Sequence, residues 1–502
     1  MDPTCIPVIV GIGEVKDRPA DPSSGQEPLA LMAAALRRAQ DDAGAALLER
    51  LDSLDVVNVV SWQYDDLPAL LSQTVGARPA RQRYGKVGGQ TPIQFLHEAA
   101  QRIARGESEV AAVCGAEASY TATWARRNGV ALNWTAGGSQ ASNGAWLPAR
   151  NRDYLHPLAR AHGITEPITV YPLYENASQA AWGQTPAQGR TESAELWTRL
   201  SQVASVNPIA WMQRAVPAAE IAAAGPANRP IAWPYPKLMV ANPAVNQAAA
   251  ILVTSLAVAR SAGVPTDRMI YIHGGAAASE PRDWMQRDSF VHAAGQEAVL
   301  GAILRQLDGR ALGPVELYSC FPIVPKMACR TLGLPDTVVP TTAGGLTFHG
   351  APLSNYMTHG AAGVVRALRA APDAPGLLYA QGGYLTWHHG LVLGAAPAPA
   401  ETVFASVDVQ AEADRRRGAA PRIADAAEGP AILETFTIVF RPDASIAFGA
   451  ALLRLADGAR TLARVPPEDH ATLDVLMDDA VNPIGLQGHV GPGGDGLLRW
   501  QA

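Results

Sequence analysis

Apolar runs and amphipathic stretches alternate along most of the chain, in the order expected for strands joined by helices. The short β-branched run Ile6–Gly13 predicts a buried strand, and the Ala- and Leu-rich stretch Leu29–Gly44 predicts the helix after it. In a second unit, Thr91 caps a helix that ends at Gly106, and Val110–Gly115 is the next buried strand. Strands that are apolar on both faces and separated by amphipathic helices indicate a parallel sheet that helices cover on both sides.

A similar alternation returns from Lys237 onward. Asn246–Gly263 predicts an Ala-rich helix. The strands and helices expected after it, in chain order, are Met269–His273, Gln296–Leu307, Val315–Cys320, Gly360–Ala370 and Gly376–Ala380. The two parts of the chain therefore carry comparable α/β content, although they share no obvious sequence identity.

The segment Tyr120–Pro236 lies between these parts and shows no sustained strand alternation. It is rich in Trp, Pro, Asn and Ala, and it predicts a large loop domain that caps a site. Its tryptophans present too much aromatic surface to be left in water, so we expect them to be packed. They are Trp124, Trp134, Trp146, Trp182, Trp197, Trp211 and Trp233.

The tail changes to the two-residue alternation of strands. After the polar stretch Pro397–Pro430, the segments Glu434–Phe440, Ala450–Leu455 and Thr461–Val465 alternate or run apolar between turns. We interpret Pro430–Ala502 as a small OB-like β-barrel. This part is Asp-rich and poor in exposed aromatics, so packing against the rest of the chain is favoured over binding to nucleic acid.

Composition limits the classes of function. With 502 residues, 48% of them hydrophobic, the chain can bury a large core and should form about two to four structural units. A net charge of −6 gives no electrostatic basis for binding nucleic acid or an anionic membrane. No apolar run is long enough to span a bilayer, and the first ten residues lack the features of a signal peptide, so we expect a cytoplasmic protein.

The cysteines and histidines predict neither a disulfide framework nor a metal site. The four cysteines are scattered and form no CxxC pair. The pair His388-His389 and the separate His349 and His359 show no ligand spacing that would indicate zinc.

A Gly-rich segment carries the clearest chemistry. Gly344–Gly360 reads GGLTFHGAPLSNYMTHG and resembles the active-site loop of the thiolase superfamily. Collinear matches are Glu117 in CGAEAS, Ser193–Trp211, Glu316–Pro322 and Ala380–Gly383. Residues 5–400 thus resemble this superfamily, and more narrowly its SCP2-thiolase branch, which implies an α/β fold of five layers, α-β-α-β-α, duplicated around a loop domain.

The usual catalytic positions of that family are vacant or altered here. Gly89 stands at the place of the nucleophilic cysteine, Ala351 replaces a histidine, Ala380 replaces a cysteine, and Tyr318-Ser319 replace the first two residues of an HDCF segment. This combination resembles the thiolase-like proteins of type 1, which carry an added C-terminal domain. The resemblance divides the chain into 1–119 (first half), 120–236 (loop domain), 237–400 (second half), 401–429 (linker) and 430–502 (OB-like domain).

The resemblance also implies where chemistry would occur. His349, His359 and His388 are candidates for general acid/base catalysis, and each could equally be a hydrogen-bonded structural residue. Tyr318 could donate a hydrogen bond to a carbonyl and Asn355 could orient a substrate, while Cys320 is a nucleophile candidate whose structural role is favoured. The glycines expected to form a backbone cradle for coenzyme A are Gly89, Gly344, Gly345, Gly350, Gly382 and Gly383.

These points lead to one hypothesis and two alternatives. The hypothesis is an acyl-CoA-dependent acyltransferase or lyase that makes or cleaves a carbon–carbon bond β to a CoA thioester without a cysteine nucleophile. Coenzyme A would be substrate or product, with no permanently bound cofactor, and a homodimer is compatible with the resemblance. The alternatives are a non-catalytic acyl-CoA or lipid binder and a subunit of a larger complex.

Overall fold

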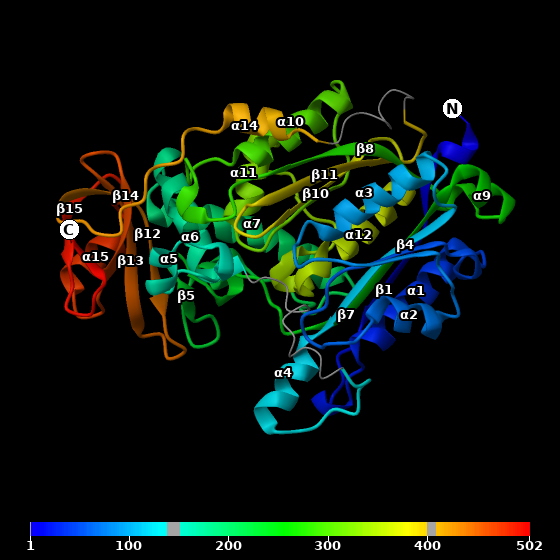
Figure 1. The fold of residues 1–502 in the computed structure, drawn as a ribbon, viewed down its shortest axis with the longest axis horizontal. Helices are drawn as coiled ribbons and strands as arrows, with labels where there is room; N and C mark the ends of the chain where they lie inside the picture. The colour runs from blue at the N-terminus through cyan, green and yellow to red at the C-terminus, as the bar shows by residue number, and fades with distance from the viewer. Residues whose placement is uncertain (1, 138–150, 399–407) are drawn as a thin grey trace.

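The computed structural model describes residues 2–137, 151–398 and 408–502, and its centre is a nine-stranded sheet (Figure 1). The strand order is β3-β2-β4-β7-β1-β8-β11-β10-β9. The strands are β1 (Pro7–Lys16), β2 (Ser53–Val56), β3 (Arg81–Tyr84), β4 (Val110–Ala118), β7 (Asn246–Ser255), β8 (Ile270–Ser279), β9 (Val315–Leu317), β10 (Gly376–Gly382) and β11 (Trp387–Gly394).

The sheet consists of two halves with the same series of pairings. From the centre outward, β1 pairs antiparallel with β7, β7 antiparallel with β4, and β4 parallel with β2. On the other side, β8 pairs antiparallel with β11, β11 antiparallel with β10, and β10 parallel with β9. The halves meet where β1 pairs with β8. The expected duplication is confirmed, but the sheet is mixed and not parallel, because the strand that ends each half returns antiparallel beside the first.

Helices and the two halves of the sheet form five layers. Helices α3 (Thr91–Ala104) and α12 (Tyr356–Ala370) contact strands of both halves and lie between them (Figure 1). The outer face of the first half packs against α1 (Pro28–Ala43), and α10 (Ala294–Leu307) covers the outer face of the second. Other outer helices are α2 (Leu67–Val75), α9 (Leu256–Ser261), α11 (Ile323–Leu332) and α14 (Gln410–Arg416).

The helix predicted over Asn246–Gly263 is wrong. Residues Asn246–Ser255 form β7, a fully buried strand between β4 and β1, and only the short α9 follows. Alanine favours helices, but tertiary packing overrides this preference here. The small side chains of Ala248 and Ala250 belong to the core cluster that also contains α1.

The amino end of α3 also differs from the expectation. The helix begins at Thr91, but the cap residue is Gln90, and its side chain makes no capping hydrogen bond. Instead, the Thr91 hydroxyl donates to the carbonyl oxygen of Lys86 at 3.2 Å. The helix start is therefore fixed by the loop that precedes it.

The region between the halves is mainly helical and packs over the second half. Its helices are α4 (Ser119–Asn128), α5 (Pro157–Ala161), α6 (Pro167–Ala181), α7 (Pro186–Val206) and α8 (Ala218–Ala222), followed by the short strands β5 (Pro230–Ala232) and β6 (Tyr235–Pro236). Trp197 and Trp211 are buried, and the other described tryptophans of this region are partly buried, as predicted. Trp146 lies outside the described residues.

The tail forms a closed five-stranded β-barrel, in which β12 pairs with both β13 and β15. Its strands are β12 (Gly429–Phe440), β13 (Ile446–Leu455), β14 (Arg460–Val465), β15 (Gln487–Pro492) and β16 (Leu498–Gln501), with helix α15 (His470–Leu476). Residues 401–407 of the expected linker lie outside the described residues, and 410–416 of it form α14.

The barrel packs against the helical region, as its composition suggested. The Thr435 hydroxyl donates to the carbonyl oxygen of Leu173 at 2.6 Å, and the Asn176 side chain donates to that of Phe436 at 2.9 Å. The backbone of Trp233 donates to Ile438. Among the helices that the structure describes, none has the length and apolar character needed to cross a membrane.

Candidate functional site at the amino end of α3

Gly89 lies just before α3, against the second half of the sheet. A Cβ atom built at this position would be 2.5 Å from the carbonyl oxygen of Gln381 and 2.6 Å from the hydroxyl oxygen of Tyr318. Both distances are far below a van der Waals contact, so a side chain here would require the backbone or the ring to move. Tyr318 therefore fills the space that a side chain at position 89 would need.

Two side-chain amides at this point have an acceptor without a partner. A Cβ at Gly382 would be 2.0 Å from Oε1 of Gln90, which places Gly382 directly over that amide. Oε1 of Gln90 and Oε1 of Gln381 are both buried and accept no hydrogen bond. Buried polar atoms are normally paired, so these two oxygens mark a place where a ligand with O–H or N–H groups would be favoured.

The Gly-rich loop forms a π-helical turn over Gly345–His349 between two glycines with left-handed backbone. Gly344 has φ 116° and Gly350 has φ 108°, which L side chains rarely adopt. A Cβ at Gly344 would also be 2.6 Å from that of Ala204 on α7. The glycine frame is therefore a requirement of this backbone, and Gly345 of the same loop and Gly383, between β10 and β11, also have positive φ.

Tyr318 and Cys320 follow β9 and face the central layer. Burial raises the pKa of the Tyr318 phenol, so it stays protonated and can act as a hydrogen-bond donor. Burial also raises the pKa of the Cys320 thiol, to about 12. The side-chain amide of Gln381 donates to this sulfur at 3.3 Å and to the Tyr171 hydroxyl at 2.7 Å. Cys320 thus lacks the environment of an activated nucleophile.

Asn355 is fully buried and joins two elements. Its side-chain amide donates to the carbonyl oxygen of Gly115 at 2.7 Å, and its oxygen accepts from the Thr358 hydroxyl at 2.6 Å. The first bond connects the start of α12 to β4, and the second lies within the first turn of α12. The structure therefore gives Asn355 a positioning role and no free polar atom for a substrate.

His349 and His359 come together with Glu14 of β1, and all three are buried. Nδ1 of His359 donates to Oε1 of Glu14 at 2.6 Å, and Arg366 donates to the other carboxylate oxygen at 2.5 Å. Burial lowers the pKa of His349 to about 3, with a smaller contribution from the neighbouring His359. Burial alone would raise the pKa of Glu14, but the bond to His359 and the charges around it hold the value at about 2.

His388 lies on the other face of the sheet. A Cβ at Gly295, in the first turn of α10, would be 2.8 Å from its ring, and its Nδ1 is 2.7 Å from the hydroxyl oxygen of Tyr379. Nε2 is hydrogen-bonded to the carbonyl oxygen of Leu385 at 3.1 Å. Burial, followed by the charge of Arg287, lowers its pKa to about 3. Alternation along β11 turns this side chain toward α10, so the structure does not bring His388 together with His349 and His359.

Glu14 was not predicted as a site residue from the sequence. It is 345 positions away from His359 and belongs to no motif, so only the fold brings the two together. Gln90 and Gln381 were also missed, because an uncharged amide beside a glycine carries no chemical signal of its own.

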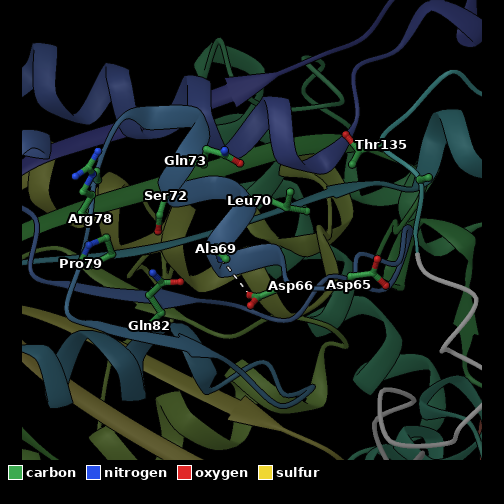
Figure 2. A pocket seen from close by; sticks show the side chains of 12 residues that line it. Asp65, Asp66, Ala69, Leu70, Ser72, Gln73, Arg78, Pro79, Gln82 and Thr135 are labelled. Atoms are coloured by element: carbon green, nitrogen blue, oxygen red, sulfur yellow. Dashed lines mark hydrogen bonds between the residues drawn. The ribbon is translucent and has the colours of Figure 1, made fainter.

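A separate pocket of about 700 Å³ opens beside α2 (Figure 2). It is lined by α2 residues, by Arg78, Pro79 and Gln82, and by Thr135 and Ala136 of the following region. Asp66, on its wall, accepts from the backbone of Ala69 at 3.1 Å as the cap of α2. As far as the structure describes it, the lining includes none of the predicted site residues.

Comparison with known proteins agrees with this architecture. A family model described as the thiolase-like protein type 1 additional C-terminal domain matches residues 408–495. The crystal structure of a monomeric SCP2-thiolase like protein type 1 from Mycobacterium smegmatis is 27% identical, with a TM-score of 0.81 over 100% of this chain and 99% of that one. The chain has a thiolase-like fold and carries the additional domain of type 1.

More distant structures share the fold of the thiolase-like part. An Ltp2-ChsH2(DUF35) aldolase is 21% identical, with a TM-score of 0.57 over 78% of this chain and 98% of that one. An acetyl-CoA acetyltransferase from Syntrophomonas wolfei is 14% identical, with a TM-score of 0.55 over 78% and 100%. No curated protein sequence matches the chain.

In this thiolase-like chain, the backbone of the site matches what the resemblance predicts for the family, but the side chains supply no nucleophile. The loops around the amino end of α3 keep the glycines that the resemblance predicted. The place expected for the nucleophile is closed by Tyr318, and the nearby thiol of Cys320 is neutral. An arrangement of this kind can hold a carbonyl or enolate by backbone and phenol hydrogen bonds, but it offers no acyl-accepting side chain at position 89.

Proposed function

We propose that this thiolase-like protein binds a CoA thioester at the amino end of α3 and makes or breaks the carbon–carbon bond β to it without an acyl-enzyme. The observation that carries the proposal is the contact of Gly89 with Tyr318 and the backbone of Gln381. It keeps the glycine-lined helix start free of a nucleophile and puts a protonated phenol beside it. The positive end of the helix and this phenol would stabilise negative charge on a thioester oxygen.

A retro-aldol cleavage is the reaction that fits these groups best. The β-hydroxyl group loses its proton, the bond between Cα and Cβ breaks, and the electron pair passes into the thioester enolate. The enolate is then protonated at Cα, which releases an aldehyde or ketone and a shorter acyl-CoA. The unpaired amide oxygens of Gln90 and Gln381 would accept hydrogen bonds from the substrate, and Tyr318 would donate to the developing oxyanion.

The test is a panel of β-hydroxyacyl-CoA and β-ketoacyl-CoA substrates, aromatic ones included, with product analysis by mass spectrometry. We expect Tyr318→Phe to lower kcat about 100-fold while the Kd for the thioester stays the same, since the hydroxyl acts mainly on the enolate. Tyr271→Phe, on β8, removes a hydroxyl from another buried tyrosine and serves as the matched control. Absence of carbon–carbon cleavage or formation across the panel would count against the proposal.

A second candidate function is non-catalytic binding of acyl-CoA. It is favoured by the burial of every ionisable candidate at or near the site, since Cys320, His349 and His388 all have pKa values shifted toward their neutral forms. Calorimetry with CoA and acyl-CoA separates the two functions. Tight binding without turnover, unaltered by Tyr318→Phe, would establish a binder, and no binding at all would exclude both.

A further inference from the structure

Three polar residues from distant parts of the chain meet in the central layer: Glu14 of β1, His359 of α12, and His349 of the Gly-rich loop before α12. Glu14, His349 and His359 each offer one ligand atom, and these atoms lie within 4.8 Å of one another. Each of the two histidines has 0% of its surface exposed. Imidazole nitrogens and carboxylates are the groups that bind transition metals in proteins.

The hydrogen bonds of the two rings leave the same atom free. Nδ1 of His359 donates to the Glu14 carboxylate, and Nδ1 of His349 is 3.2 Å from the carbonyl oxygen of Ala343. Asn207 is 3.4 Å from the same Nδ1, but the Ala343 carbonyl oxygen is nearer and can only accept, so we place the His349 proton on Nδ1. Nε2 of both rings then carries a lone pair, and both atoms are buried without a partner.

A second pair of buried histidines shows how two neighbouring rings normally pair their nitrogen atoms in a hydrogen bond. Nδ1 of His97, on α3, is 3.0 Å from Nε2 of His389, on β11, so the two rings share one proton. Neither of these two nitrogens is left unpaired. The rings of His349 and His359 are at a similar separation, 4.8 Å between centroids, yet no hydrogen bond joins them. Two unpaired acceptors on buried rings this close together would be stabilised by a group that accepts electron pairs from both or donates protons to both.

We propose that His349 and His359 bind one transition-metal ion through their Nε2 atoms, with Glu14 orienting His359 from behind. A histidine ligand usually donates its other nitrogen to a carboxylate or a backbone carbonyl, and both arrangements are present here. Zinc bonds of about 2.0–2.1 Å at a tetrahedral angle would place the two Nε2 atoms about 3.3 Å apart on binding. The ion would fasten the loop that ends at Gly350 to α12 and β1, independently of the function proposed above.

The charge around the site fits a single cation. Glu14 is negative, and Arg366, which bonds to it, has a side chain that is 46% exposed, so water screens much of its charge. Ligands of this type favour zinc, cobalt, nickel or copper over magnesium or calcium, which require more oxygen ligands.

The test uses the full chain, stripped with a chelator and titrated with Zn²⁺ in competition with a chromophoric chelator, and in parallel with Co²⁺ to record its visible spectrum. We expect one equivalent per chain. His349→Gln and His359→Gln should raise the Kd at least about 100-fold, and Glu14→Gln about 10- to 100-fold. The controls are His97→Gln, in the closed pair, and His489→Gln, in the barrel, and both should leave the Kd unchanged.

Crystals grown with Zn²⁺ and measured at the zinc absorption edge provide a second test that needs no variant. An anomalous peak between the two rings supports the proposal. A water molecule at that place overturns it, as does zinc binding that survives both His349→Gln and His359→Gln, because the ion would then occupy a surface site. Circular dichroism establishes that each variant is folded, and if a histidine variant does not fold, the crystal measurement decides.

Discussion

The amino end of α3 and the cluster around Glu14 are both buried in the central layer, but only the second contains ionisable side chains with unpaired atoms. At the end of α3, the carbonyl oxygen of Gln381 and the neutral phenol of Tyr318 occupy the place expected for a nucleophile, and no room is left for a side chain at Gly89. Around Glu14, a carboxylate and two imidazoles lie in the interior, and two nitrogen atoms remain unpaired. The nucleophile position of the resemblance is thus without a reactive side chain, whereas ionisable groups gather around a carboxylate, Glu14, that the sequence did not indicate.

This contrast suggests what each region tolerates. The site at α3 is closed by packing, so substitutions that add volume there should lower the stability of the fold, whereas loss of the Tyr318 hydroxyl should lower kcat and leave stability nearly unchanged. The Glu14 cluster is defined by charge and protonation, so it should respond to acid and to loss of the carboxylate.

The largest expected difference between the two regions appears on acidification of the metal-free protein. Burial lowers the pKa of His349 from 6.5 to about 3, so below pH 6.5 the unfolded chain binds a proton that the folded chain does not. Stability should therefore decrease as the pH falls from 6.5, by about 1.4 kcal/mol per pH unit for this residue, or about 3 kcal/mol at pH 4.5. Urea unfolding midpoints over this range measure it.

His349→Gln should reduce the slope of the unfolding free energy against pH by about 1.4 kcal/mol per pH unit. Tyr318→Phe, at the end of α3, should keep the wild-type slope, since the phenol does not titrate in acid. If the two variants changed the slope equally, the electrostatic distinction between the regions would be wrong.

A similar effect is expected for Glu14→Gln at pH 7. The substitution removes the carboxylate that accepts from His359 and Arg366, and it should lower the free energy of unfolding by about 3 kcal/mol, as when one partner of a buried ion pair is lost. Chemical denaturation measures this change. Glu49→Gln, an exposed carboxylate, is the control and should change stability by less than about 0.5 kcal/mol.

Gly89→Ala should lower the free energy of unfolding by a smaller amount, about 2 kcal/mol, because the added methyl group would overlap the Gln381 backbone and the Tyr318 ring. Thermal and urea unfolding measure the loss. Gly301→Ala, within α10, places its methyl group at ordinary contact distance and should be neutral or stabilising by up to about 1 kcal/mol. A Gly89→Ala protein as stable as the wild type would mean that the end of α3 is not closed.

Much of the fold could be predicted from the sequence, because local patterns determine it. The strand at Ile6–Gly13 and the helix at Leu29–Gly44 were found within a few residues as β1 and α1, and the β-character of the tail followed from alternation. The Ala-rich strand β7 was not found, since its identity depends on the two strands beside it. The family resemblance supplied the duplication and the additional domain.

The site could be predicted only in part. The glycine frame and Tyr318 were found because they stand in a motif, and the absence of a nucleophile at Gly89 was visible as a substitution. The partner of His359 could not be found, because a pairing across 345 positions leaves no local pattern. The face on which His388 lies could not be predicted either, since a register shift of one residue reverses the direction of a strand side chain.

The smallest expected effect is on the reactivity of the Cys320 thiol near the end of α3, and it involves no change in stability. A thiol with a pKa of about 12 is ionised in about one molecule in 10⁴ at pH 8, and Cys320 is also buried. Iodoacetamide should therefore modify the partly exposed Cys5 in the native protein and leave Cys320 unmodified, as mapped by peptide mass spectrometry. In urea both should react, which controls for the peptide being detectable. Selective and rapid modification of Cys320 in the folded chain would reveal an activated nucleophile, and the end of α3 would then resemble the Glu14 cluster in carrying its own side-chain chemistry.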